Sequence, residues 1–104
     1  METRSKARTF IGFAIKAGRM RFGMNSVNSL KRAALILCCK SAAENTAKEA
    51  VSAAKKFGCP LLITKDAPLS DMVHRENVKA AAITDRRLAR AVLDNAEEEF
   101  TVGN

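Results

Sequence analysis

Three short apolar runs, separated by longer segments with helical periodicity, constrain the fold of this 104-residue chain more than any other feature. The runs cover residues 33–39, 61–63 and 80–83 and contain no charged side chain. Continuous apolar runs of this length are typical of strands that are covered on both faces. A fourth, basic strand is predicted at residues 19–22, where polar and apolar side chains alternate. Strands that alternate with helices predict an α/β fold, here a three-layer α-β-α sandwich with a central four-stranded mixed sheet.

Five helices are predicted from apolar stripes at helical spacing and from residues that commonly begin or end helices. The predicted ranges are about 3–17, 25–32 with Asn25 as N-cap, 41–57 with a capping box at Ser41–Glu44, 66–74, and a last helix that starts at Thr84 or Asp85 and contains Leu88 to Ala96. Gly18 and Gly58 are predicted to end helices in a left-handed conformation. Residues 1–104 should form one domain, because no linker or repeat interrupts them, and the acidic tail, about residues 97–104, is expected to fray.

Positive charge is concentrated in the first part of the chain. Residues 1–40 contain nine Lys or Arg and one acid, whereas residues 41–104 contain nine Lys or Arg and ten acids, so the first segment accounts for the net charge of +7. Such asymmetry predicts one basic face for an anionic partner, although a basic surface that serves only solubility also explains it. No apolar run approaches the ~20 residues of a membrane span, and no helix pairs a basic face with bulky apolar anchors, so a membrane partner is not expected. The residues expected to converge on the basic face are Arg4, Arg8, Arg19, Arg21, Lys31 and Arg32.

Few residues could support catalysis. His74 is the one histidine and lies at a predicted helix end, and the five glycines are scattered rather than grouped in a phosphate-binding loop. We therefore expect no enzyme activity, no cofactor and no metal site. Cys38, Cys39 and Cys59 form no regular framework, which predicts reduced thiols and a cytoplasmic location. Cys38 and Cys39 should point to opposite faces of one strand as small buried side chains.

The best local candidate for nucleic-acid binding is the segment Arg19-Met-Arg-Phe-Gly-Met-Asn25. A basic strand leads there into Gly23 and a helix start, and helix N-termini bind phosphate while glycine lets a ligand approach the backbone. Lys31 and Arg32 close the same predicted helix. Taken alone, the spacing is explained equally well by a turn at Gly23 and a cap at Asn25.

Longer segments resemble a known family. Residues 10–19 (FIGFAIKAGR) are similar to the opening helix of the bacterial YlxQ-type proteins, and residues 23–25 (GMN) to the start of that family's Gly-x-Asn-Glu signature. Similarity to its central strand, its next helix start and its later strands continues at residues 33–37, 41–46, 57–63 and 80–85. The resemblance covers about residues 8–95. The YlxQ-type proteins belong to the superfamily of the ribosomal proteins L-seven-Ae, L-thirty-e and S-twelve-e and of the Gadd-forty-five proteins.

The resemblance implies a sandwich that binds the kink-turn of structured RNA, ribosomal or other, with no DNA expected, and an association with the ribosome or a translation factor. In the family, the Gly-x-Asn-Glu turn contacts tandem sheared G·A pairs, and the loop before the last strand packs on an extruded nucleotide. By this carry-over Asn25 would pair with base edges and Val78 would cover a splayed base. Together with the basic residues, the expected RNA-binding set is Arg19, Arg21, Gly23, Asn25, Ser26, Ser29, Lys31, Arg32, Asn77, Val78 and Lys79.

The chain departs from the family pattern at two positions after the turn. The family's Glu falls on Ser26, and the Lys three residues later falls on Ser29. The first interpretation is a small, ribosomal-protein-like RNA-binding protein whose contacts are mostly to phosphate. The alternative is the same fold without kink-turn specificity, acting as a loose RNA binder or a protein-interaction scaffold in ribosome or translation assembly. The two serines favour the alternative, and the basic first segment opposes it.

Overall fold

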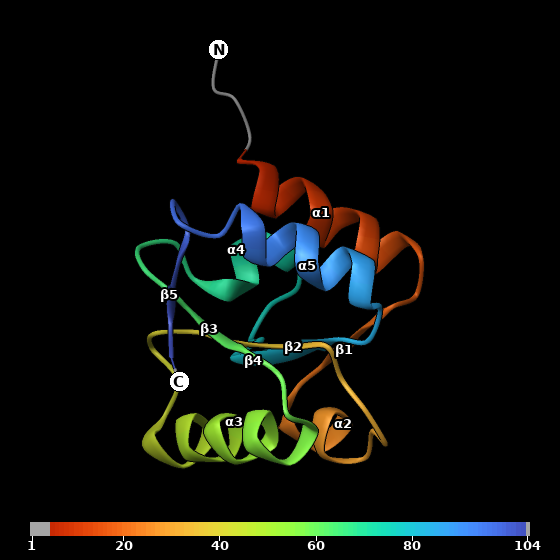
Figure 1. Ribbon diagram of the computed structural model, residues 1–104. Helices are drawn as coiled ribbons and strands as arrows, with labels where there is room; N and C mark the ends of the chain where they lie inside the picture. The colour runs from red at the N-terminus through yellow and green to blue at the C-terminus, as the bar shows by residue number, and fades with distance from the viewer. Residues whose placement is uncertain (1–4, 104) are drawn as a thin grey trace.

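The computed structural model describes residues 5–103 as helices and strands packed in three layers (Figure 1). In chain order the elements are α1 (Lys6–Lys16), β1 (Met20–Phe22), α2 (Met24–Asn28), β2 (Leu35–Cys38), α3 (Glu44–Phe57), β3 (Leu61–Thr64), α4 (Leu69–Val73), β4 (Ala80–Ile83), α5 (Arg86–Asp94) and β5 (Phe100–Val102). Helices α1, α4 and α5 cover one face of the sheet, and α2 and α3 cover the other (Figure 1). The predicted α-β-α sandwich is therefore confirmed. In the described part of the chain, no helix combines the length and apolar character that crossing a membrane requires.

The sheet has the strand order β1-β4-β2-β3-β5, in which β2 and β3 are parallel and the other pairs are antiparallel. Strand β2 lies at its centre and is buried along its whole length. Leu35 and Leu37 pack into the core beneath α1 and α5, whereas Ile36 and Cys38 pack against α3. The apolar run has no polar position because helices cover both of its faces. Cys38 and Cys39 point to opposite sides, as predicted, and both are buried.

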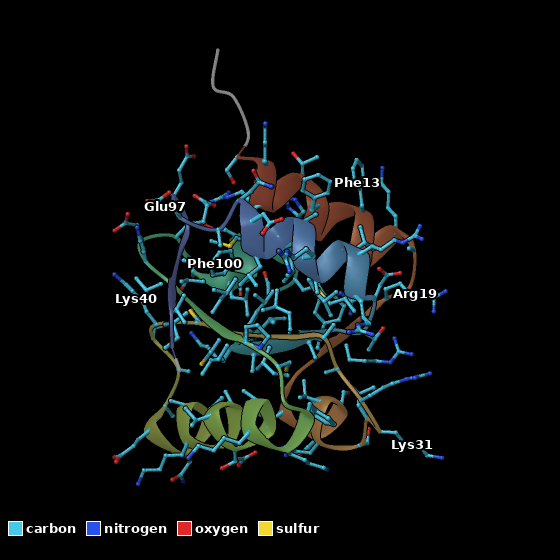
Figure 2. The ribbon with its side chains drawn as sticks, viewed as in Figure 1. Phe13, Arg19, Lys31, Lys40, Glu97 and Phe100 are labelled. Atoms are coloured by element: carbon cyan, nitrogen blue, oxygen red, sulfur yellow. The ribbon has the colours of Figure 1, made fainter. Side chains whose placement is uncertain are left out.

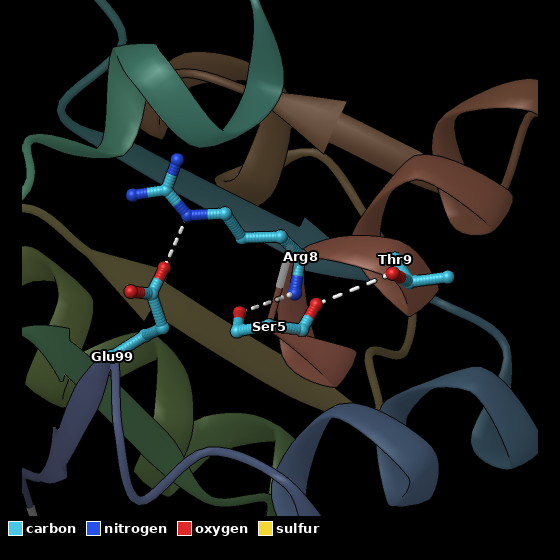
Figure 3. Close-up of polar contacts among 4 residues, drawn as sticks. All are labelled: Ser5, Arg8, Thr9 and Glu99. Carbon is cyan, nitrogen blue, oxygen red and sulfur yellow. Dashed lines mark hydrogen bonds and ion pairs between the residues drawn. The ribbon is translucent and has the colours of Figure 1, made fainter. Parts of the chain in front are cut away.

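The prediction of a frayed tail and a four-stranded sheet is wrong, because the C-terminal residues form a fifth strand. Strand β5 pairs antiparallel with β3, with Phe100 opposite Thr64. The Phe100 side chain is only 3% exposed and belongs to the core beneath α1. Glu99 forms an ion pair with Arg8 of α1 (Figure 3). The three glutamates that precede this strand made the segment resemble a disordered tail in the sequence. In the folded protein, burial of the Phe100 side chain outweighs this local preference.

Several predicted helix ends are confirmed. Gly18 and Gly58 have φ angles of 70° and 62°, so each follows its helix in the left-handed conformation expected of glycine. Asp85 is the N-cap of α5, and its carboxylate accepts a hydrogen bond from the Leu88 amide at 2.9 Å. Helix α1 begins after Ser5, whose hydroxyl oxygen accepts a hydrogen bond from the Arg8 amide (Figure 3). The predicted start at Thr3 lies outside the described residues.

Other helix ends were predicted wrongly. Gly23, not Asn25, occupies the N-cap position of α2, and this helix ends at Asn28 instead of Arg32. Helix α3 has Ala43 as its N-cap residue and no side-chain cap, so no capping box forms at Ser41. Helix α4 begins only after Pro68, rather than at residue 66. In each case the backbone leaving the preceding strand sets the helix start, and tertiary geometry overrides the local capping preference.

Candidate nucleic-acid interface

The turn at Gly23 lies beside the loop that precedes β4. The Gly23 amide donates a hydrogen bond to the Ala80 carbonyl at 2.8 Å, directly beyond the point where Phe22 of β1 pairs with Ala81 of β4. This bond brings two segments that are more than fifty residues apart in the sequence to the same end of the sheet. We call this region the turn surface and define it by its exposed or partly exposed residues Gly23, Asn25, Ser26, Arg75, Asn77 and Lys79.

The backbone conformation, rather than lack of space, requires glycine at position 23. Its φ angle is 84°, in the region that side chains rarely adopt, while an added Cβ would meet no atom within 4 Å. Asn25 follows in the first turn of α2 with its side chain exposed, and this side chain forms no hydrogen bond with any described residue. Asn77 in the facing loop is also exposed and has a φ of 60°. Both amide groups are therefore open to an external partner.

Two cations are held at the turn surface. The Arg75 guanidinium lies 4.1 Å from the centre of the Phe22 ring, a cation–π contact that fixes its position. The Lys79 ammonium donates a hydrogen bond to the Ser41 hydroxyl at 3.0 Å. Arg75 was not among the predicted site residues, since only the packing of its loop against β1 reveals it. The loop also carries Glu76, so the turn surface is less positive than the charge of the N-terminal segment suggests.

Val78 does not face outward as a base-covering residue would. Its side chain is 7% exposed and belongs to the core on the α1 side of the sheet. Its amide donates to the Ser70 hydroxyl at 3.1 Å, and that hydroxyl donates to the Val78 carbonyl at 3.3 Å. Side chains alternate along the extended segment that enters β4, so Asn77 and Lys79 point outward and Val78 inward. The predicted role of Val78 is therefore wrong.

A thiol lies beneath this end of the sheet. Burial raises the pKa of Cys39, but hydrogen bonds from Ser41, from the backbone of Leu69 and from Thr64 outweigh it and lower the pKa to about 7. Cys39 is only 2% exposed, so its thiol is not accessible to a ligand. The thiol instead forms a hydrogen bond with the Ser41 hydroxyl. Burial raises the pKa of the other two thiols, those of Cys38 and Cys59. Among the described residues, no three His, Cys, Asp or Glu side chains are grouped so that they could hold a metal ion.

The remaining predicted cations do not converge on the turn surface. In Figure 2, Arg19 and Lys31 lie on one side of the molecule and Lys40 lies on the opposite side. Arg19 directly precedes strand β1 (Met20–Phe22) and Gly23 directly follows it, so charges at the two ends of the strand are separated by its length. The Arg21 guanidinium turns back to the Gly18 and Met20 carbonyls. The prediction of one basic face around Gly23 is thus wrong.

Arg8, another residue of that prediction, lies elsewhere. Arg8 forms an ion pair with Glu99 beside β5, and this pair partly neutralises its charge (Figure 3). Arg4 lies outside the described residues. Ser29 is exposed, and its hydroxyl donates to the Ser26 carbonyl of its own helix at 2.8 Å. Neither serine replaces the charged groups that the family pattern has at these two positions.

Arginines from the last helix join Arg19 and Arg32 instead. The Thr84 amide donates to the Arg19 carbonyl at 2.8 Å, which places the start of α5 next to the start of β1. We call this region the arginine surface; it consists of Arg19, Arg32, Arg86, Arg87 and Arg90, all of them exposed. Sequence reasoning missed the three α5 residues because the second part of the chain has no net positive charge. The available signal was the pair of arginines that directly follows the last predicted strand.

The comparisons with known proteins show the fold. No family model matches the chain, and no curated protein is significantly similar to it. A solved structure described as a protein with unknown function from Bacillus halodurans is similar over 90% of this chain and 99% of its own, with a TM-score of 0.75 and 14% identity. At that identity the likeness supports the α/β sandwich and carries no statement about activity.

Proposed function

We propose that this protein is a non-enzymatic RNA-binding protein that recognises structured RNA of the kink-turn type through the turn surface. The observation that carries the proposal is the hydrogen bond from Gly23 to Ala80, which joins the turn that leads to Asn25 with the segment that follows Asn77 and Lys79. Amide side chains can donate to and accept from base edges, and flanking cations contact phosphates. The setting that fits this function is the cytoplasm, with ribosomal RNA, the ribosome or a translation factor as the partner.

A second candidate is the same fold used without kink-turn specificity, as a loose RNA binder or an assembly scaffold. The observation that favours it is the pair Ser26 and Ser29, in which the Ser29 hydroxyl donates to the Ser26 backbone carbonyl and neither side chain supplies a charge. In this case the protein would contact RNA phosphates and would not recognise the G·A pairs. The two candidates differ in whether the RNA must be kinked.

The two candidates are separated by Asn25→Ala. Loss of base-edge hydrogen bonds should cost about 1–3 kcal/mol of binding free energy toward a kink-turn RNA, by analogy with bidentate base contacts in DNA grooves. The melting temperature should not change measurably, because Asn25 is exposed and does not cap the helix. Asn45→Ala, at an exposed asparagine in the first turn of α3, is the matched control and should bind like the wild type. Fluorescence anisotropy titration measures both variants.

The same titration is repeated with an RNA whose G·A pairs are changed to Watson–Crick pairs. The kink-turn proposal requires the wild type to prefer the kinked RNA by about tenfold or more, a difference of about 1.4 kcal/mol. It also requires Asn25→Ala to lose this preference. Equal affinity of the wild type for both RNAs would reject kink-turn recognition in favour of the second candidate.

A further inference from the structure

A groove with an apolar floor runs beside the arginine surface, at the end of the sheet opposite the turn surface. It lies between the end of α3, the start of β3 and the length of α5, and its volume is about 510 Å³. Its apolar lining includes the partly buried residues Phe57, Pro60 and Leu93, which we call the floor. Arg32, Arg86 and Arg90 form its rim. The volume lies within the range of ~300–1,000 Å³ that is usual for small-molecule sites.

The charge on the rim is largely uncompensated within the described residues. Neither Arg32 nor Arg86 forms an ion pair or a side-chain hydrogen bond there, and both are exposed. Only Arg90 has a carboxylate partner, the exposed Asp94 at 3.2 Å. The nearby carboxylate of Asp85 accepts the Leu88 amide as the α5 cap. Fixed positive charge at the edge of an apolar groove attracts an anionic ligand that also has an apolar face.

A second hollow of about 530 Å³ continues from this groove. It shares Arg32, Thr84 and Arg86 with the groove and adds Arg19, Arg87 and Asp85, the one carboxylate beside its four arginines. The cations therefore form a path along the surface rather than a single point. A path of this kind matches a chain of successive phosphates better than one isolated anion.

We propose that this groove binds an unpaired nucleotide of single-stranded RNA, with its base on the apolar floor and its phosphates on Arg32 and Arg86. A guanidinium group can form bidentate hydrogen bonds with phosphate oxygens. A base has a flat apolar face that can pack against the floor. An acidic peptide would satisfy the arginines but would leave the floor unused. The site does not involve the turn surface, so it does not depend on recognition of a kink-turn.

The test uses an unstructured single-stranded RNA of roughly ten nucleotides, within the usual site sizes of single-strand binders. In the double variant Arg32→Gln/Arg86→Gln, affinity should fall at least tenfold, and the slope of log affinity against log salt should become shallower by about 1.4, or 0.7 for each lost phosphate contact. The control is Lys6→Gln/Lys48→Gln, which removes the same charge from exposed positions outside the groove and should bind like the wild type. A circular dichroism melt shows whether each variant is folded.

Three outcomes would overturn the proposal. The groove variant could bind this RNA with unchanged affinity and salt slope. Alternatively, the control variant could lose as much RNA affinity as the groove variant. A poly-glutamate peptide of equal length could compete as well as the RNA, which would assign the groove to an acidic protein. None of these outcomes affects the comparison of kinked with Watson–Crick RNA, so failure here is distinguishable from failure of the kink-turn proposal.

Discussion

Raising the salt concentration from about 50 to about 200 mM should weaken binding of a kink-turn RNA with a single-stranded extension by roughly a thousandfold. Each phosphate that a cation contacts releases counterions, so affinity depends steeply on salt. Two cations at the turn surface and four of the arginine surface are exposed and have no carboxylate partner among the described residues. They are Arg75, Lys79, Arg19, Arg32, Arg86 and Arg87. Six such contacts predict a log–log slope near −5.

Anisotropy titrations across this range of salt measure the slope. Asn25→Ala is a useful control, because loss of a neutral base contact should lower the affinity at every salt concentration and leave the slope unchanged. Affinity that barely moves with salt would contradict phosphate binding at either surface. It would indicate a protein partner or a small ligand in place of RNA.

Replacing Phe100 by alanine should destabilise the protein by about 3–5 kcal/mol, the usual cost of deleting a buried aromatic side chain. Phe100 is 3% exposed and fills the core between β3 and the helices above it, so its loss leaves a cavity. Val102→Ala is the matched control in the same strand. Val102 is 67% exposed, and its substitution should change the free energy of unfolding by no more than about 0.5 kcal/mol. Urea unfolding followed by circular dichroism gives both values.

An equally small effect of the two substitutions would mean that β5 does not contribute to the fold in solution. An unfolding slope (m-value) that falls in Phe100→Ala would indicate that part of the chain is already open in the variant. The expected result is a lower urea midpoint with the slope unchanged, because β5 unfolds together with the rest of the sheet.

The buried strands could be predicted from the sequence because their signal is local. A run such as Leu35 to Cys38 has no polar position, and only burial on both faces explains it. Strand β5 gave no such signal: it is three residues long and follows three glutamates. Its existence depends on the backbone groups that β3 leaves available and on the space that Phe100 fills. Both are properties of the assembled sheet.

The candidate site was predicted only in part, for a related reason. That Gly23 and Asn77 belong to one site was predicted from the family resemblance. In the structure, the pairing of β1 with β4 brings their two segments together. The grouping of cations does not follow from their order in the chain, because Arg19 and Gly23 lie at opposite ends of a strand while Arg19 and Thr84 are in contact. Charge that is evenly balanced over residues 41–104 can still be concentrated in space, as the α5 arginines show.

The contact between the two ends of the chain has a consequence for synthesis. Arg8 bonds to Glu99, and α1 packs along α5 on the same face of the sheet (Figure 1). One of the two core layers is thus built from two helices that lie about 70 residues apart in the sequence. The parallel unit β2–α3–β3 is local in sequence and can form while the chain is still being made, but α1 has no complete partner until α5 has been synthesised. Contacts of such long sequence separation slow folding, and they leave the apolar stripe of α1 exposed to chaperones until α5 has been synthesised.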